Sequence, residues 1–218
     1  IQNHSNSEVF RLCSVLQSGI LTFLSMESIR EYWIKNMVCR RCLKVIKQEL
    51  EDINVQVLSL ELGKLTVLTS SASVEQIDNQ IKEVLFANGF EIAISDEEML
   101  IEEVKITLIE LTKELPIHLK VKTSELLASK LHLDYKVLSK MFSKNESTTI
   151  EKYLIKLKLE KVKELIQLQQ HTFSDIAYLL DYSSINHLSR LFKNVTGSSM
   201  TDYKNTQVWE RNFFDEII

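Results

Sequence analysis

Two cysteines in one short loop are the side chains of this chain best suited to chemistry. Cys39 and Cys42 lie within residues 37–42, MVCRRC, where a spacing of two residues lets both thiols reach one atom. The two arginines between them, Lys44 and the start of a predicted helix all favour thiolate over thiol. Two soft thiolates without a nearby carboxylate suit Cu(I), which accepts two ligands, whereas zinc usually takes four. A redox role for the thiol pair is an alternative.

Residues 173–204 hold the second set of functional candidates. Their pattern predicts a short helix, a tight turn, a second helix with Asn186, Arg190 and Lys193, and an end at Gly197. Such a helix-turn-helix places its second helix in the major groove of DNA. A weaker copy of the pattern at 124–143 makes the unit an internal repeat.

The charge distribution supports this interpretation. The chain of 218 residues has a formal net charge of −4, which by itself argues against nucleic acid. Residues 1–114 carry 11 Lys/Arg and 18 Asp/Glu, whereas residues 115–205 carry 14 basic and 9 acidic residues. The basic block contains both helix-turn-helix units, as expected of a DNA-facing domain.

Hydrophobic periodicity predicts the elements that carry the cysteine loop. Strands are expected where apolar residues alternate, and helices where they recur every three to four positions. In chain order these segments are a strand at 28–36, a helix at 41–53, a hairpin at 55–67, a helix from 74 to Asn88-Gly89, and a strand at 90–94. The order β-α-β-β-α-β predicts a ferredoxin-like α+β domain at 28–95.

A predicted helix at 96–114, capped by Asp96, connects this domain to the rest of the chain. Its apolar stripe is wide enough either to pack on the next domain or to form a dimer seam. We expect its packing to couple the thiol loop to the DNA-binding half. Glutamate at Ile101 or Leu108 is then expected to break the coupling and to leave each separate binding event largely intact.

The remaining residues up to 205 are predicted to be helical. Thr148 or Thr149 caps a long helix that ends near Leu168 and joins the two repeats, and Ser183 caps the last recognition helix. A helix of ~20 residues spans ~30 Å, close to the ~34 Å repeat of B-DNA. Two recognition helices held this far apart can enter successive major grooves.

Residues 115–205 resemble the AraC/XylS family of bacterial transcription regulators. The second unit carries the resemblance, in Ile176-Ala177, Tyr182-Ser183, Leu188-Ser189-Arg190, Phe192-Lys193, Thr196-Gly197 and Tyr203-Lys204. Asp181 and His132-Leu133 stand where the family has a turn glycine, and Met200 where it has proline. The resemblance implies an all-α double helix-turn-helix domain, at 116–205, that binds double-stranded DNA.

The family pattern also implies which side chains face DNA. Seven of them lie outward on the two recognition helices: Lys136, Ser139, Lys140, Ile185, Asn186, Arg190 and Lys193. Arg190 suits a guanine edge, Asn186 an adenine edge and Ile185 a thymine methyl group. Lys193 and Lys144 are expected to meet phosphates. The core is expected to hold Leu138, Met141, Leu188, Leu191 and Phe192.

Residues 28–95 resemble the heavy-metal-associated (HMA) domain of copper chaperones and metal-pumping ATPases. The resemblance rests on M-x-C-x-x-C, on the element order and on Asn88-Gly89-Phe90-Glu91. It implies Cys39 and Cys42 as metal ligands and Met37 as a buried loop anchor. Asn36 departs from the family, which has glycine there. Cu(I) is the expected metal, with Ag(I), Hg(II), Cd(II) and Zn(II) as alternatives.

The sequence predicts five segments and argues against several classes of protein. They are a flexible extension at 1–27, the HMA-like domain at 28–95, a linker helix at 96–115, the DNA-binding domain at 116–205 and a tail at 206–218. Three cysteines fit a reducing, cytoplasmic location rather than a disulfide framework. No apolar run reaches the ~18 residues of a membrane span. Scattered histidines and the lack of a catalytic motif predict no enzyme.

The sequence therefore predicts a DNA-binding transcription regulator that responds to a soft metal ion. One alternative is a metal-independent regulator whose N-terminal domain serves dimerisation or partner binding. Another is a regulator that responds to thiol oxidation. Double-stranded DNA is the expected partner and a membrane is not, while RNA polymerase and a second copy of the chain stay open as further partners.

Overall fold

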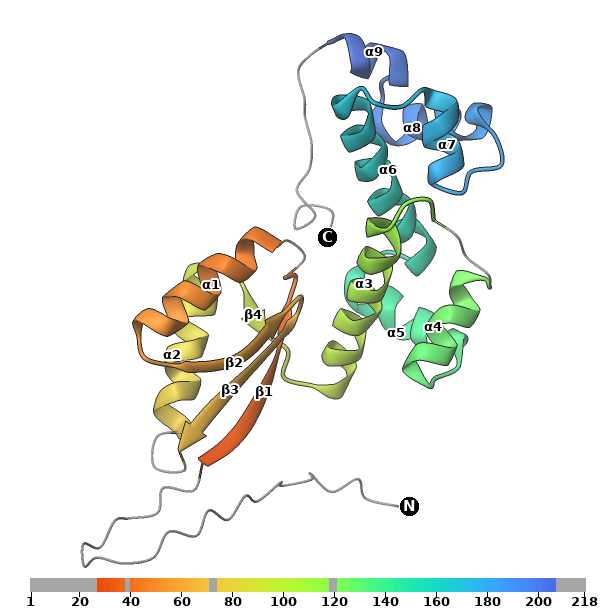
Figure 1. The fold of residues 1–218 in the computed structure, drawn as a ribbon. Helices are drawn as coiled ribbons and strands as arrows, with labels where there is room; N and C mark the ends of the chain where they lie inside the picture. The colour runs from red at the N-terminus through yellow and green to blue at the C-terminus, as the bar shows by residue number, and fades with distance from the viewer. Residues whose placement is uncertain (1–26, 38–39, 71–73, 118–120, 207–218) are drawn as a thin grey trace, which may run out of the picture.

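The computed structural model describes residues 27–37, 40–70, 74–117 and 121–206. Two lobes are visible in Figure 1, a mixed α/β lobe from the N-terminal half and an elongated helical lobe from the rest. Among the described helices, none combines the length and the apolar character that crossing a bilayer requires. The predicted extension at 1–27 and the tail at 206–218 fall almost entirely outside the described residues.

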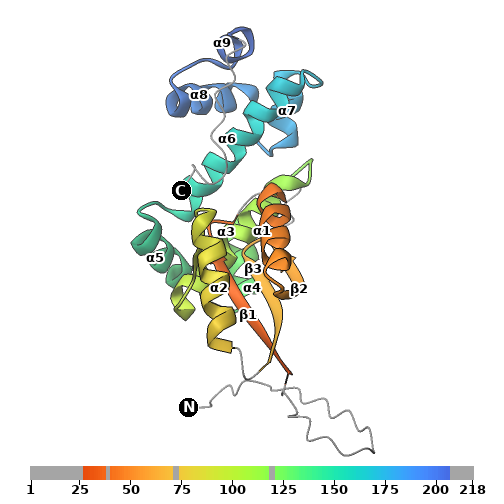
Figure 2. The ribbon, with the colours of Figure 1, turned by 90° about the vertical axis from the view of Figure 1, so that its left-hand side faces the viewer.

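The N-terminal lobe is one antiparallel sheet with two helices. In chain order its elements are β1 (Glu27–Lys35), α1 (Arg40–Asp52), β2 (Gln56–Glu61), β3 (Lys64–Ser70), α2 (Val74–Ala87) and β4 (Glu91–Ile92). The strands lie in the order β2-β3-β1-β4, and every pair is antiparallel. Both helices cover the same face of the sheet (Figures 1 and 2).

The core of this lobe follows from the apolar periodicity. Inward-facing Ile34, Leu65 and Val67 of the sheet pack against fully buried side chains of α1 and α2, which include Ile46 and Leu85. Burying each such side chain contributes about 1.5–3 kcal/mol. The expected strand at 90–94 is shorter than predicted. Strand β4 covers only Glu91–Ile92, and the Ala93 N–H still donates to the Trp33 carbonyl oxygen of β1 at 2.8 Å. The chain then turns toward the start of the next helix, and Ile94 is left 83% exposed.

Helix α3 (Asp96–Lys113) follows β4 and belongs to both lobes. Ser95, rather than the predicted Asp96, caps it, because the Ser95 hydroxyl accepts from the Glu98 N–H. On one side α3 packs against the tip of the β2–β3 hairpin. Gly63 there has φ +69, and a Cβ at this position would lie 2.5 Å from Ile106 Cδ1.

The other side of α3 forms part of the first helical core. Ile101, Val104, Leu108 and Ile109 are buried in it. The wide apolar stripe is therefore used within this chain, on two neighbours. Glutamate at Ile101 or Leu108 would therefore place a carboxylate in this core and destabilise it, so neither variant separates coupling from stability.

Six further helices form the helical lobe. They are α4 (Thr123–Leu131), α5 (Tyr135–Glu146), α6 (Ile150–Leu168), α7 (Phe173–Leu179), α8 (Ile185–Thr196) and α9 (Met200–Asn205). Asp134 caps α5, Thr149 caps α6 and Ser184, not Ser183, caps α8. The helices surround two separate cores, and α6 contributes to both of them.

The two cores repeat one design. Leu138 and Phe142 of α5 are buried in the first, and Leu188 and Phe192 of α8 are buried in the second. Each phenylalanine has an edge-to-face tyrosine partner, with ring centroids 5.6 Å apart in the first core and 5.7 Å apart in the second. The pattern that predicted an internal repeat therefore corresponds to a repeat of packing.

Candidate functional site

Each helix-turn-helix depends on a left-handed residue in its turn. His132 (φ 52) ends α4, and Asp181 (φ 58) follows α7. Glycine enters this region without steric cost, whereas other residues rarely do. Aspartate and histidine are among the better-tolerated alternatives, which accounts for turns that lack glycine.

A buried lysine of α6 stabilises the second turn. Lys158 of α6 donates to the Leu180 carbonyl oxygen at 2.8 Å, and its Nζ lies 5.2 Å from the centroid of the Tyr182 ring. Burial lowers the pKa of the Lys158 ammonium, and it raises the pKa of Tyr182 to about 12. Lys158 therefore serves the fold, so the excess of basic residues in this block overstates the charge available to a ligand.

The two recognition helices, α5 and α8, lie toward opposite ends of α6 (Figures 1 and 2). Helix α6 has 19 residues, which corresponds to about 28 Å at 1.5 Å per residue. This length is close to the separation predicted from the sequence. The spacing suits two helices that follow one face of a duplex.

Helix α5 presents a row of cations to solvent. Lys136, Lys140 and Lys144 are exposed at successive intervals of four residues, which places them on one helix face. Ser139 lies beside them and is half-buried. Lys144 lies 3.4 Å from Glu97 Oε1 of α3, so one cation of this row has an acidic neighbour.

Helix α8 presents a different set of side chains. Asn186, Arg190 and Lys193 are exposed and share one face. Ile185 is half-buried and packs against the second core, so only part of it remains for a ligand. The expected core residues Leu138, Leu188 and Phe192 are buried, whereas Met141 and Leu191 are half-buried.

The exposed cations of the two faces are available to an anionic ligand. In the part of the chain that the structure describes, no salt bridge involves Lys136, Lys140 or Arg190. The same holds for Lys193. Arginine and asparagine can each make bidentate contacts with a base edge, whereas lysine acts as a point charge.

The thiol loop is only partly described. Cys39 and Val38 lie outside the described residues, so the thiol pair stays a prediction. Cys42 is the third residue of α1, is half-buried and packs against the N-terminal core. Met37 is 1% exposed, as expected of a loop anchor. Among described residues no group of three or more His, Cys, Asp or Glu side chains could hold a metal ion.

Asn36, which precedes this loop, occupies a position that favours glycine. Its φ is 61, in the left-handed region, where asparagine is better tolerated than most residues. Its backbone N–H donates to Glu102 Oε2 at 3.0 Å, and its side-chain Oδ1 accepts from Lys105 Nζ at 2.8 Å. These contacts could not be read from the sequence, because Asn36 lies more than 60 residues before Glu102 and Lys105.

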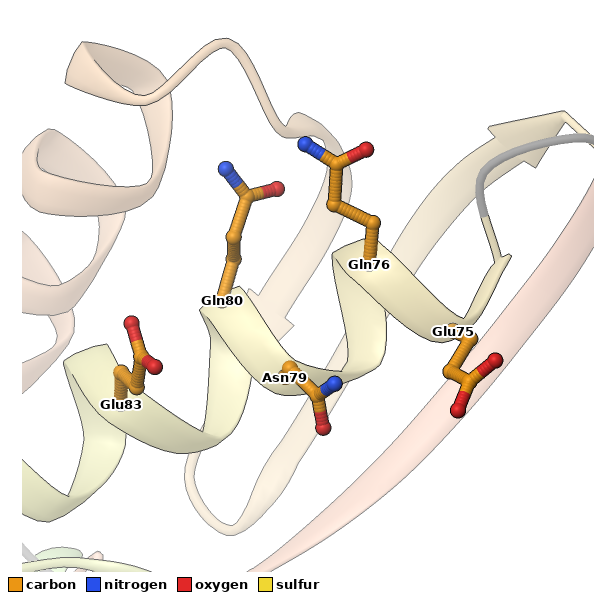
Figure 3. A pocket seen from close by; sticks show the side chains of 5 residues that line it. All are labelled: Glu75, Gln76, Asn79, Gln80 and Glu83. Atoms are coloured by element: carbon orange, nitrogen blue, oxygen red, sulfur yellow. The ribbon is translucent and has the colours of Figure 1, made fainter.

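Two hollows of the N-terminal lobe offer less chemistry. One, beside α2, is lined by Glu75, Gln76, Asn79, Gln80 and Glu83. Figure 3 shows these side chains fanning out from a single helix rather than converging on one point. The other is an apolar groove of about 400 Å³ between α2 and β4, in which Phe86 is 77% exposed.

Comparison with known proteins identifies the helical lobe. Residues 127–206 match a family described as a helix-turn-helix domain. The chain is similar to the C-terminal domain of AraT, a response regulator from Geobacillus stearothermophilus, with 19% identity over 55% of this chain and 94% of that one and a TM-score of 0.44. Curated proteins give no significant match.

Two further solved structures resemble the chain. One is a transcriptional regulator from Chromobacterium violaceum described as containing an AraC-type DNA-binding domain, with 18% identity over 49% of this chain and 94% of that one and a TM-score of 0.42. The other is the transcriptional regulator CdpR from Pseudomonas aeruginosa, with 11% identity over 73% of this chain and 50% of that one and a TM-score of 0.39. The family match, joined to the duplicated turn and helix geometry, identifies residues 127–206 as a helix-turn-helix domain.

Proposed function

We propose that this chain is a sequence-specific transcription regulator that binds double-stranded DNA with α5 and α8 and responds to a soft metal ion, with Cu(I) the best match. The observation that carries the DNA-binding part is the pair of exposed polar faces at the two ends of α6. Lys136 and Lys140 lie on one face, and Asn186 and Arg190 on the other.

A selection from random duplex DNA tests the DNA-binding part. The full chain should enrich a site with two motifs about one helical turn apart, because α5 and α8 would enter successive major grooves. Phosphate neutralisation should make the affinity fall steeply with salt. Enrichment of no motif, together with no binding at low salt, would contradict the proposal.

The metal-responsive part rests on the donor set and on the fold around it. We propose that the N-terminal lobe has a ferredoxin-like fold, which its element order and its strand order β2-β3-β1-β4 support. Cys42 lies in the first turn of α1, where the positive end of the helix dipole favours thiolate. The residues present therefore suit a soft metal, which Cys39 and Cys42 would hold.

Competition with a chromogenic Cu(I) chelator under anaerobic conditions tests this part. We expect one Cu(I) per chain, lost in Cys39→Ser and in Cys42→Ser. Cys13→Ser is the matched control and should bind as the wild type does. Loss of Cu(I) in Cys13→Ser would instead indicate a site of three thiolates.

One observation favours a second candidate function for the N-terminal lobe. The groove between α2 and β4 exposes Phe86 and Ile94, and exposed apolar patches often mark contacts with another protein. A metal-independent regulator would use this groove for dimerisation or partner binding. Sedimentation of wild type and Phe86→Ala, each with and without Cu(I), distinguishes the two candidates.

A further inference from the structure

A buried ammonium lies where the two lobes meet. Lys105 of α3 is 1% exposed. Its Nζ lies 2.7 Å from Glu102 Oε1, 3.0 Å from Glu146 Oε1 and 2.8 Å from Asn36 Oδ1. An ammonium has three N–H donors, so each donor has one acceptor. We call these four residues the Lys105 cluster.

Two members of the Lys105 cluster lie at the ends of the two segments that are proposed to bind metal and DNA. Asn36 directly precedes the thiol loop at 37–42. Glu146 is the last residue of α5, the first recognition helix. Asn36 has a second contact with the cluster, because Glu102 Oε2 accepts from the Asn36 backbone N–H at 3.0 Å. The cluster therefore connects the start of the thiol loop to the end of a DNA-facing helix.

Because the Lys105 cluster is buried, it tolerates only small displacements of its members. Two carboxylates and an amide oxygen share one buried ammonium, and moving any of them away leaves one of its N–H donors without an acceptor in a water-poor site. Tyr153 of α6 lies beside them, and its buried hydroxyl has no hydrogen-bond partner among described residues. Burial and the nearby charges of Glu102 and Glu146 raise the pKa of the Tyr153 hydroxyl.

Helix α3 is also fixed on both sides of the Lys105 cluster. Gly63 at the tip of the β2–β3 hairpin lies so close to Ile106 that a Cβ there would be 2.5 Å from Ile106 Cδ1 and would force the Ile106 side chain to move. On the opposite side, Leu108 and Ile109 are buried among residues of α4, α5 and α6. Packed interfaces of this kind shift between discrete arrangements rather than deform continuously.

We infer that the Lys105 cluster is a conformational link through which the state of the thiol loop sets the position of α5 against DNA. The inference rests on the proposed function, since it needs a loop that changes state and a helix that binds DNA. The second recognition helix has no member in the cluster, so the link acts on the first unit alone.

Asn36→Gly is the variant that tests the link most directly. Glycine keeps the left-handed backbone and the N–H that donates to Glu102, and it removes only the acceptor of Lys105. Glu146→Ala removes the opposite end of the link. The matched control is Glu110→Gln, which removes an exposed contact between α3 and α4, where Lys130 Nζ lies 3.2 Å from Glu110 Oε2.

The readout is the ratio of DNA affinities with and without Cu(I), measured by fluorescence anisotropy on the selected site. Coupling of ordinary strength gives a ratio of about 5–150 in the wild type. We expect a ratio near 1 in Asn36→Gly, in Glu146→Ala and in the double variant, and a wild-type ratio in Glu110→Gln. Affinity for Cu(I), and for DNA without metal, should stay within about threefold in Asn36→Gly.

Hydrogen exchange separates failure of the link from failure of the metal assignment. DNA binding should change amide exchange at 36–46 in the wild type and not in Asn36→Gly, because coupling is reciprocal. If Cu(I) does not bind while this exchange effect is present, the link stands and the metal assignment is wrong. A wild-type ratio in folded Asn36→Gly overturns the link, as does unchanged exchange at 36–46 in the DNA-bound wild type.

Discussion

The two helix-turn-helix units share a buried framework and differ in what surrounds it. The first unit shares its core with α3, and its recognition helix ends at Glu146 in the Lys105 cluster. The second unit lies at the far end of α6, and its recognition helix presents Asn186 and Arg190. A duplicated fold can thus divide two tasks. The comparison predicts that the first unit attaches the protein to DNA and positions it there, whereas the second unit discriminates between base pairs.

The largest expected effects come from removing the equivalent phenylalanines. Phe142→Ala and Phe192→Ala each truncate a fully buried ring, and each should lower the free energy of unfolding by about 3–5 kcal/mol. Only Phe142→Ala should also reduce protection of β1, because its core includes α3. Denaturant unfolding and site-resolved hydrogen exchange measure the two effects.

A phenylalanine outside both cores provides the control. Phe86 is 77% exposed, so Phe86→Ala should change stability by less than about 0.5 kcal/mol. Equal loss of β1 protection in Phe142→Ala and Phe192→Ala would mean that the two units unfold as one body. The division between an attached unit and a distant unit would then be wrong.

Substitutions at equivalent positions of the two recognition helices should impair DNA binding in different ways. Arg190→Ala should cost about 1–3 kcal/mol at one base position and relax specificity there. Lys140→Ala should weaken all sequences alike and lower the salt slope by about 1. Affinities on single-base variants of the selected site, at several salt concentrations, separate the two patterns.

Lys82→Ala in the N-terminal lobe is the control for a simple change of net charge. It should leave both the affinity and the salt slope unchanged. If Lys140→Ala relaxes specificity at one base pair as Arg190→Ala does, both helices read bases and the proposed division fails.

The sequence predicted the regular elements well, because their signals are local. Apolar periodicity is enough to order six elements of the N-terminal lobe, and the polar residues before α3, α5, α6 and α8 identify the caps of these helices to within one position. Ser95 and Asp96 are both good caps, as are Ser183 and Ser184. Which of them caps depends on where the backbone turns, and the pattern of residue types does not specify that.

The contacts between the lobes could not be predicted in the same way. Lys105 and Glu102 lie on a helix, where charged side chains normally indicate a solvated face. Their burial depends on Asn36 and Glu146, which come from distant segments. The same holds for Lys158, which is part of the basic block that indicated DNA binding, although its charge is used beneath a turn. A count of basic residues therefore includes lysines whose charge is used within the fold.

Two glutamates of α3 should give opposite dependences of stability on pH. Burial raises the pKa of Glu102, although hydrogen bonds from Lys105 and Asn36 oppose this. The folded state therefore binds that proton more tightly than the unfolded state. Its stabilisation is present below the usual glutamate pKa and is lost as the pH rises through the raised value. Glu102→Gln should remove this loss and make stability fall less steeply with rising pH.

Glu98 provides the comparison on the same helix. Hydrogen bonds from Lys35 and the Ile94 N–H lower its pKa, so its stabilisation is present at neutral pH and is lost as the pH falls through the lowered value. Glu98→Gln should therefore reduce stability at pH 7 and make stability fall less as the pH is lowered. Urea unfolding across pH 4–8 measures both variants, and slopes that change in the same direction would contradict these assignments.

The smallest expected effect concerns the acidic neighbour of the first recognition helix. Glu97 Oε1 lies 3.4 Å from Lys144 Nζ and accepts from Asn145 Nδ2 at 2.9 Å, on the exposed surface. Exposed pairs contribute about 0–1 kcal/mol, so Glu97→Gln should barely change stability. It should nevertheless raise DNA affinity by up to about fivefold at low salt, because Lys144 no longer shares its charge with a carboxylate that repels phosphate. The gain should disappear near 1 M salt, where the Debye length is about 3 Å. Glu83→Gln on α2 makes the same change of net charge far from the recognition helices and should produce no gain. An equal gain in both variants would mean that overall charge, rather than the position of Glu97 beside α5, controls binding, and the first unit would lose its assigned role as the electrostatic anchor.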